Sequence, residues 1–310
     1  MGLTKSTFGW LRDGIGNLAS AQEIERQISG LSMGKVFYVN PATGGADDYD
    51  TQFPDIDGIT CFSTHQGAID ACVSNRGDLI IVKRGYEAVT TPVLFNKAGI
   101  TMVAQGFGMP PREQGEYFCI DCSSGPAAIL SLPCHIKGLG FHTSDTGTKS
   151  CNMRVDGDTS GWPGWYHIED CRFPNWGTAT EYGINFEGGA NSLVSSCTFE
   201  GTSGGQKFAA GIAYGGGSST NPIQNEVDNC RFRSCDYAIE HVDGSPQKFL
   251  YHSSFVVDGK RLNSNGALGD GNLCNWYLET AATATASDDV SIADLKTGGI
   301  NCSGNHYLDT

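Results

Sequence analysis

The sequence predicts an all-β fold, a single-stranded parallel β-helix (a solenoid) with a short N-terminal helical arm and a C-terminal cap. The first observation is composition, because 42 glycines, 39% hydrophobic residues and only 17% charged residues are typical of a turn-rich β protein. The second is a strand-like segment that recurs through the middle of the chain, and the third is another recurring segment interleaved with it. Such units cannot bury their apolar faces alone, so successive windings must stack.

The first repeat ends in phenylalanine, and in its three clearest copies an apolar residue and two polar residues precede the pattern Cys-x-Phe. The five copies are 135–141, 166–173, 193–199, 226–232 and 249–255. The intervals between their terminal phenylalanines are irregular. The second series has two nearly equal intervals and runs through Ile184, Ile212 and Ile239. Two interleaved series with one average period predict two strands in each winding.

The Cys-x-Phe pattern predicts what fills the core. Residues two apart lie on the same face of a strand, and neighbouring strands lie ~4.8 Å apart. Stacked windings are therefore expected to form two inward ladders, one of cysteines and one of phenylalanines: Cys171, Cys197 and Cys230 beside Phe173, Phe199 and Phe232. The irregular spacing leaves one alternative open, a meandering antiparallel sandwich.

Residues 1–33 are predicted to form an arm with a short amphipathic helix. Residues 1–19 carry apolar side chains among glycines with no partner segment in sequence, and Ser20 with Glu23 forms a capping box ahead of a helix over 21–29. So short a helix is not stable alone and must dock on something. The predicted partner-binding residues are Phe8, Trp10, Leu11, Ile15, Ile24, Ile28 and Leu31.

Residues 34–260 are predicted to form the β-helix. It begins with a strand over 35–39, a loop rich in Gly and Asp over 41–58, and a helix over 66–74 with Thr64 as its cap. The unbroken apolar run at 78–82 is typical of a strand covered on both sides. Further strands are expected at 100–104, 117–120 and 128–130. Residues 261–310 are expected to form a cap or an oligomer contact, because an open strand edge invites further pairing.

Charge and cysteine content limit the partners and the compartment. The net charge of −14 and the lack of a Lys/Arg cluster argue against nucleic acid as a partner. No run of eighteen apolar residues is present, so no membrane span is expected. The start of the chain lacks the basic and apolar regions of an export signal, so synthesis in a reducing cytoplasm and free, buried thiols are expected for the twelve cysteines.

No catalytic residue is predicted, and we expect that the protein is not an enzyme. Glycoside hydrolysis needs two carboxyl groups that converge on one bond. Glu169 and Asp170 are neighbours on an expected strand and should point to opposite faces. Nothing in the spacing brings another pair together among the remaining candidates, Asp228, Glu240, Asp243 and Asp258.

No cofactor or metal is predicted either. The loop with Asp47, Asp48, Asp50, Asp55 and Asp57 is rich in oxygen ligands for calcium, but it lacks the EF-hand arrangement, and an Asx-turn loop is the alternative. Cys119 and Cys122 would face opposite ways in a strand, and a zinc site needs four ligands. The seven histidines show no ligand spacing.

Several motifs give the chain a resemblance to a known family. The strand at 35–40, the Ala-Ile-Asp-Ala segment at 68–71, the Gly-Asp-Leu-Ile-Ile-Val segment at 77–82 and the coil at 99–106 occur in this order. The chain thereby resembles tailed-bacteriophage virion proteins with a right-handed parallel β-helix, of the capsid decoration (cement) or tail-spike type. The resemblance covers about residues 35–260 and implies a homotrimeric structural or surface component.

These observations lead to one functional hypothesis and its alternatives. The chain is expected to be a structural virion protein, most specifically a trimeric capsid decoration protein made in the host cytoplasm. Its arm would bind the major capsid protein or another virion protein. The first alternative is a small tail spike or receptor-binding protein that recognises or cleaves a host surface glycan through Trp162, Trp165, Trp176 and Tyr182. A third possibility is a free carbohydrate-active enzyme of bacterial origin.

Overall fold

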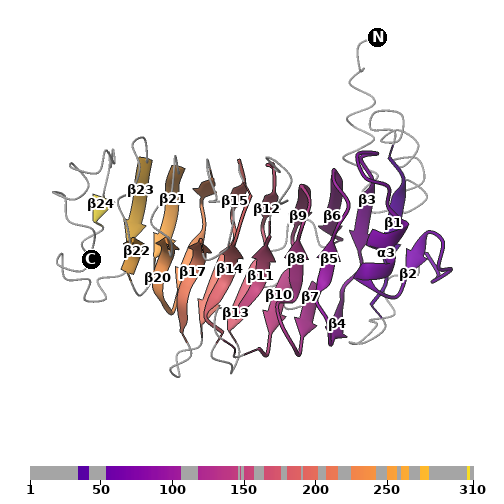
Figure 1. The fold of residues 1–310 in the computed structure, drawn as a ribbon, viewed down its shortest axis with the longest axis horizontal. Helices are drawn as coiled ribbons and strands as arrows, with labels where there is room; N and C mark the ends of the chain where they lie inside the picture. The colour runs from indigo at the N-terminus through magenta and orange to yellow at the C-terminus, as the bar shows by residue number, and fades with distance from the viewer. Residues whose placement is uncertain are drawn as a thin grey trace, which may run out of the picture.

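The structure is a computed structural model that describes the chain from residue 34 onward, with gaps. The described residues are 34–41, 54–105, 118–145, 147, 150–156, 164–175, 180–189, 191–201, 207–215, 225–241, 250–256, 260–264, 273–278 and 306–307, with side chains as far as residue 240. The strands stack along the long axis of the molecule, from β2 (Cys61–Phe62) and β1 (Val36–Val39) at one end to β24 (His306–Tyr307) at the other (Figure 1).

The described strands form three ladders in which every pairing is parallel. The first ladder contains β1 (Val36–Val39), β2 (Cys61–Phe62), β3 (Leu79–Val82), β6 (Ile100–Ala104), β9 (Cys134–Lys137), β12 (His167–Glu169), β15 (Leu193–Ser195), β18 (Glu226–Asp228), β21 (Leu250–Val256), β23 (Leu273–Leu278) and β24 (His306–Tyr307). The second contains β4 (Gly85–Val89), β7 (Phe118–Cys122), β10 (Gly140–Thr143), β13 (Arg172–Asn175), β16 (Thr198–Gly201) and β19 (Arg231–Arg233). The third contains β5 (Val93–Phe95), β8 (Ala128–Leu130), β11 (Cys151–Val155), β14 (Tyr182–Phe186), β17 (Phe208–Tyr214), β20 (Cys235–His241) and β22 (Lys260–Ser264).

The chain is therefore an all-β parallel solenoid in which each full winding contributes one strand to each ladder. The third ladder is a 7-stranded sheet, and the first two join into a 17-stranded sheet because β21 pairs with both β18 and β19. The parallel pairings contradict the antiparallel sandwich. The prediction of two strands in each winding was wrong, since a full winding has three. Pairing continues past residue 260 through β22, β23 and β24.

The third strand of each winding was not predicted because the chain bends sharply inside the repeat. Asp170, Ser196 and Asn229 have φ angles of 52°, 54° and 49°, and each lies between a strand of the first ladder and a strand of the second. Short polar side chains of this kind tolerate the left-handed region better than most residues, so they allow a sharp bend there. The segment 166–173, predicted as one strand, is thus split into β12 and β13.

Stacked phenylalanines fill the core behind the second ladder. Phe141, Phe173, Phe199 and Phe232 are fully buried, and successive ring centroids are 5.8, 4.9 and 4.8 Å apart. Their spacing is close to the strand spacing, as in-register parallel pairing requires. The backbone of Phe232 pairs with Val256, whereas Phe255 pairs with Arg231, so the last phenylalanine of the repeat is out of register by one position.

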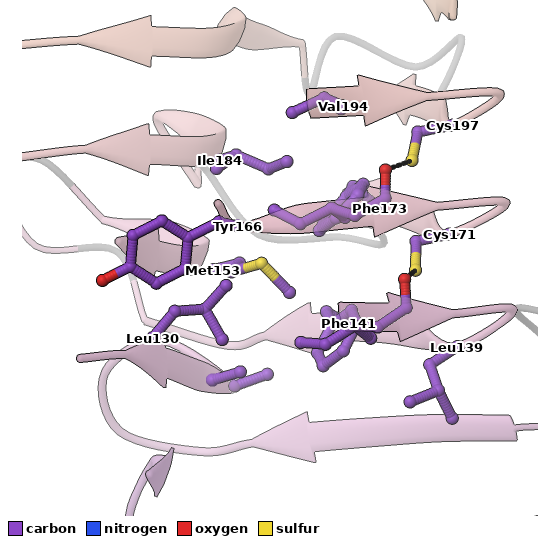
Figure 2. Packing of buried hydrophobic residues seen from close by; sticks show 14 of the residues in the cluster. Leu130, Leu139, Phe141, Met153, Tyr166, Cys171, Phe173, Ile184, Val194 and Cys197 are labelled. Carbon is purple, nitrogen blue, oxygen red and sulfur yellow. Dashed lines mark hydrogen bonds between the residues drawn. The ribbon is translucent and has the colours of Figure 1, made fainter. Parts of the chain in front are cut away.

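Cysteines form a second column at the corners. Cys171, Cys197 and Cys230 are buried, and each directly follows one of the left-handed residues. Their thiols donate hydrogen bonds to the carbonyls two positions earlier, at Sγ–O distances of 3.2, 3.3 and 3.3 Å. Figure 2 shows Cys171 and Cys197 above Leu139, beside the rings of Phe141 and Phe173. Burial raises the pKa of the Cys197 thiol, so this member of the column is neutral.

A short helix packs at the β1 end of the solenoid. Helix α3 (His65–Ala71) begins after Thr64, whose side-chain oxygen accepts a hydrogen bond from the amide of Gly67 at 3.1 Å, as expected for an N-cap. Its Ala68 and Ile69 are buried in the main core. At the start of the helix, the imidazole of His65 lies against the carboxylate of Glu87, which occupies the inward position of β4. Among the described residues, no helix is long and apolar enough to cross a membrane.

Candidate functional site

The outer face of the first ladder carries a group of interacting polar side chains, which we name the histidine cluster: His135, Lys137, His167 and Glu169. Strands β9 and β12 pair in register, so that His135 lies beside His167 and Lys137 lies beside Glu169. Ile136 and Ile168 between them are buried, and the strand alternation therefore turns the cluster toward solvent. The four side chains are 22–35% exposed.

The carboxylate of Glu169 is the centre of the histidine cluster. Its Oε1 lies 2.6 Å from Lys137 Nζ, and its Oε2 lies 3.2 Å from His135 Nε2 and 3.8 Å from His167 Nε2. The two imidazole rings are stacked, with centroids 4.2 Å apart and planes at 7°. Ser195 Oγ, in the next winding, lies 3.5 Å from His167 Nε2.

The ionisation of the histidine cluster follows from these contacts. Burial would raise the pKa of Glu169, but the hydrogen bond and charge of Lys137 and the bond to His135 outweigh it, and the pKa is lowered. Burial lowers the pKa of His167, and the neighbouring His135 lowers it further. The cluster therefore holds an ionised carboxylate beside an imidazole that favours its neutral form.

The candidate carboxylates are not arranged as the sequence suggested. Asp170 lies at the corner and not in the strand, and its Oδ2 is 3.3 Å from Lys137 Nζ, the same ammonium that Glu169 contacts. The expectation that Glu169 and Asp170 point to opposite faces was therefore wrong, because the left-handed corner interrupts the strand alternation. Asp228 pairs with Ser195, which pairs with Glu169, so the two carboxylate positions are two windings apart in one column. Glu240 lies on the third ladder, and Asp243 and Asp258 lie outside the described residues.

The predicted aromatic platform is only partly within the described residues. Trp165 is 76% exposed and has a φ angle of 77°, an unusual conformation for a bulky residue. It lies two positions before His167 in the sequence. Tyr182 is buried and does not present an aromatic surface to solvent. Trp162 and Trp176 lie outside the described residues.

The remaining predicted sites are placed as follows. The Asp57 carboxylate accepts backbone hydrogen bonds from Ile59, Thr60 and Cys61, which lower its pKa, and the hydroxyl of Thr60 donates to it at 2.7 Å. These contacts are those of an Asx-type turn. Asp47, Asp48 and Asp50, like all seven predicted partner-binding residues of the arm, lie outside the described residues. Cys119 and Cys122 are both buried, free thiols.

The second ladder carries two further polar groups. Asp121 accepts a hydrogen bond from Tyr86 and lies 2.8 Å from His142 Nδ1. Nearer the other end, Glu200 lies between Arg172 Nη2 at 2.9 Å and Arg233 Nη1 at 3.2 Å. In both groups the charged or polar partners come from neighbouring windings, so these contacts link one winding to the next.

The histidine cluster was missed in the sequence because its members are far apart in the chain. The signal was nevertheless present, since the separation of His135 and His167 in the sequence equals that of Phe141 and Phe173. Applying the repeat spacing to the polar residues would have placed the two imidazoles in adjacent windings.

The fold and the site define a parallel β-solenoid protein with a filled core and polar groups that connect successive windings on its outer faces. No family model matches the sequence, and no curated protein matches it. Among solved structures, one match is Geobacillus virus E2 ORF18, with 14% identity, a TM-score of 0.34 and coverage of 79% of this chain. The chain spans 58% of the length of that bacteriophage protein.

Proposed function

We propose that the chain is a structural protein of a tailed-bacteriophage particle and that its solenoid is a right-handed β-helix. In its most specific form, the proposal is a homotrimeric capsid decoration (cement) protein. The observation that carries it is the continuous packing of the interior, where Phe141, Phe173, Phe199 and Phe232 stack through four successive windings.

A filled, in-register solenoid suits a load-bearing role. Each winding contacts only its neighbours, and the ladders and ring stacks repeat the same contacts along the axis. Such a body is stiff because close-packed interiors have low compressibility. The net charge of −14 favours solubility of the individual copies and attraction to a basic surface on the particle.

We propose further that the protein is not an enzyme. The Glu169 carboxylate is held by Lys137 and His135, and Asp170 contacts the same lysine. Carboxylates tied into mutual ion pairs between windings are suited to stabilising the stack. A general acid in glycoside hydrolysis would instead need a raised pKa, whereas the pKa of Glu169 is lowered.

Attachment to the particle is assigned to residues 1–33, and this part of the proposal rests on the sequence. The arm carries Phe8, Trp10, Leu11 and Ile15 with no partner segment in sequence, followed by the apolar face of the predicted helix. The partner is the major capsid protein or another virion protein, and the location is the virion after synthesis in the host cytoplasm.

The test is co-sedimentation of the purified chain with coat shells that lack it. The full chain should bind the shells, and a chain without residues 1–33 should retain its β circular dichroism but fail to bind. The variant Trp165→Ala serves as a control that removes an exposed aromatic residue outside the arm and should bind normally. Binding by the truncated chain would refute the role of the arm. The molar mass of the free protein from light scattering tests the proposed trimer.

A second candidate function is recognition of a surface glycan by a tail spike or receptor-binding protein. The exposed Trp165 favours it, because an exposed aromatic side chain held in an unusual backbone conformation is a suitable platform for a sugar ring. Binding on a glycan array that Trp165→Ala abolishes would favour this function over the structural one. Released oligosaccharide would indicate that the glycan is also cleaved.

A further inference from the structure

We propose that His135, His167 and Glu169 form a binding site for a divalent transition-metal ion of the Zn²⁺ class on the outer face of the solenoid. The ligand atoms of these three residues all lie within 4.8 Å of one another. They come from adjacent strands, β9 and β12, which the in-register ladder holds side by side. The site is independent of the proposed attachment to a virus particle.

The distances fit a single ion. Zinc binds imidazole nitrogen at ~2.0–2.1 Å, so two ligand atoms at the corners of a tetrahedron are about 3.3 Å apart. Glu169 Oε2 lies 3.2 Å from His135 Nε2 and 3.8 Å from His167 Nε2. The two edges that the carboxylate makes with the imidazoles are thus close to the required length.

The groups around the three ligands support the site. Lys137 Nζ contacts Glu169 Oε1 at 2.6 Å, which turns Oε2 toward the imidazoles, the orienting role that an outer partner plays at metal sites. Lys137 also contributes a positive charge, but the carboxylates of Glu169 and Asp170 outnumber it, so the local charge favours a cation. Ser195 Oγ, 3.5 Å from His167 Nε2, and water are available for the fourth position.

The stacked imidazoles need one adjustment. Their planes are at 7°, so their nitrogen lone pairs lie in two nearly parallel planes and the rings must tilt for both to reach one ion. The χ2 torsion of histidine has broad energy wells, and both side chains are about one-third exposed, so the tilt is available at low cost. Two imidazoles and one carboxylate select Zn²⁺, Co²⁺ or Ni²⁺ over Ca²⁺ and Mg²⁺, which prefer oxygen ligands alone.

The test is titration of the full chain, free of any histidine tag and treated with chelator, with Zn²⁺ and Co²⁺ under calorimetry. One ion should bind to each chain. His135→Ala, His167→Ala and Glu169→Gln should each weaken binding by about tenfold or more, since changes even to outer partners of metal ligands cost about 10–100-fold. The matched control is Glu226→Gln, which removes the same charge on the same face two windings from His167 and should bind like the unmodified chain.

Two further readouts separate this site from other ligands. Zn²⁺ should raise the unfolding temperature of the unmodified chain above its value in chelator, whereas each of the three variants should unfold at the same temperature with Zn²⁺ as in chelator. The Co²⁺ spectrum should show nitrogen and oxygen ligation. Any of three results would overturn the proposal: no saturable binding, binding by the three variants as tight as binding by the unmodified chain, or a thiolate-to-cobalt charge-transfer band.

Discussion

The rings of Phe199 and Phe232 lie almost parallel, with centroids 4.8 Å apart and planes at 5°. Because Phe199 also stacks on Phe173, its ring has an aromatic neighbour in the winding on either side. Phe199→Ala should therefore lower the free energy of unfolding by about 3–5 kcal/mol, since it leaves a cavity that the fixed backbone ladders cannot close. Phe199→Leu, which fills more of the space, should cost less. Urea unfolding measures both, and a loss under about 1 kcal/mol for alanine would contradict the stacked core.

Gly183 is packed against the same ring. A Cβ atom at this position would lie 2.5 Å from Phe199 Cδ1 and 2.6 Å from the carbonyl oxygen of Gly211. Gly183→Ala should lower the free energy of unfolding by about 1–3 kcal/mol through overpacking. The control is Gly147→Ala, where the nearest atom is the flexible carboxylate of Asp145 at 3.3 Å, so its stability should be almost unchanged. Equal stability of the two variants in urea would show that this close approach is absent.

The sequence predicted which residues stack on one another, because the repeat spacing sets the register between successive windings. The intervals between Phe141, Phe173, Phe199 and Phe232 equal the register offsets between β10, β13, β16 and β19. The cap at Thr64 and the strand near 79–82 were also predicted, since an N-cap and an unbroken apolar run are local signals. The arm over residues 1–33 stays a prediction.

The corners and the histidine cluster were not predicted, for two physical reasons. A bend at Asp170 or Ser196 depends on φ angles that these residues adopt only in some contexts, so the strand alternation was predicted to continue through them. The contact between His135 and His167 is created by stacking and has no local pattern. Phe255 was wrongly assigned to the phenylalanine series. The local pattern recurs there, but the residue lies one position out of register with Phe232.

Glu200 bridges a buried and an exposed arginine, and the two should differ in importance. The Arg172 side chain is 3% exposed and the Arg233 side chain is 44% exposed. Glu200→Ala removes the carboxylate from a buried guanidinium and should lower the free energy of unfolding by about 3 kcal/mol. Arg233→Ala should cost about 0–1 kcal/mol, as exposed ion pairs do. The comparison is made by urea unfolding at low and high salt, and a larger loss for Arg233→Ala would reverse the assignment.

Asp78 makes the stability of the β1 end depend on pH. Burial would raise the pKa of this carboxyl, but hydrogen bonds from Arg76 and from the amides of Val73 and Lys35 lower it below 3.8. A lowered folded-state pKa stabilises the protein above the unfolded-state pKa, and this contribution is lost as the pH falls through the folded-state value. The free energy of unfolding should therefore fall in acid, below about pH 4.

The matching variant is Asp78→Asn, which should be less stable at neutral pH and lose less stability in acid than the unmodified chain. Asp70→Asn makes the same charge change at an exposed position of α3 and should keep the pH dependence of the unmodified chain. Urea unfolding from about pH 6 to about pH 2 measures the slope. Parallel curves for all three proteins would mean that Asp78 has an ordinary pKa.

The cysteines should be unreactive in the folded protein. The ten cysteines whose side chains the structure describes are free and buried, and burial raises the pKa of Cys119 and Cys151 to about 12. Only the thiolate attacks a disulfide reagent, so at about pH 8 these groups are almost entirely in the inert form as well as inaccessible. With Ellman's reagent, no more than two of the twelve thiols should react in the native chain, and all should react in urea.

A reactive control shows that the reagent is working. Val73 is half exposed just after α3, and Val73→Cys should add one thiol that reacts at once in the native chain. Because each thiol of the corner column lies between two windings, labelling of Cys171, Cys197 or Cys230 requires the ladders on both sides of the corner to separate. Their labelling rate in dilute urea therefore reports the opening of the solenoid, and rapid labelling of more than two thiols without urea would be incompatible with a closed core.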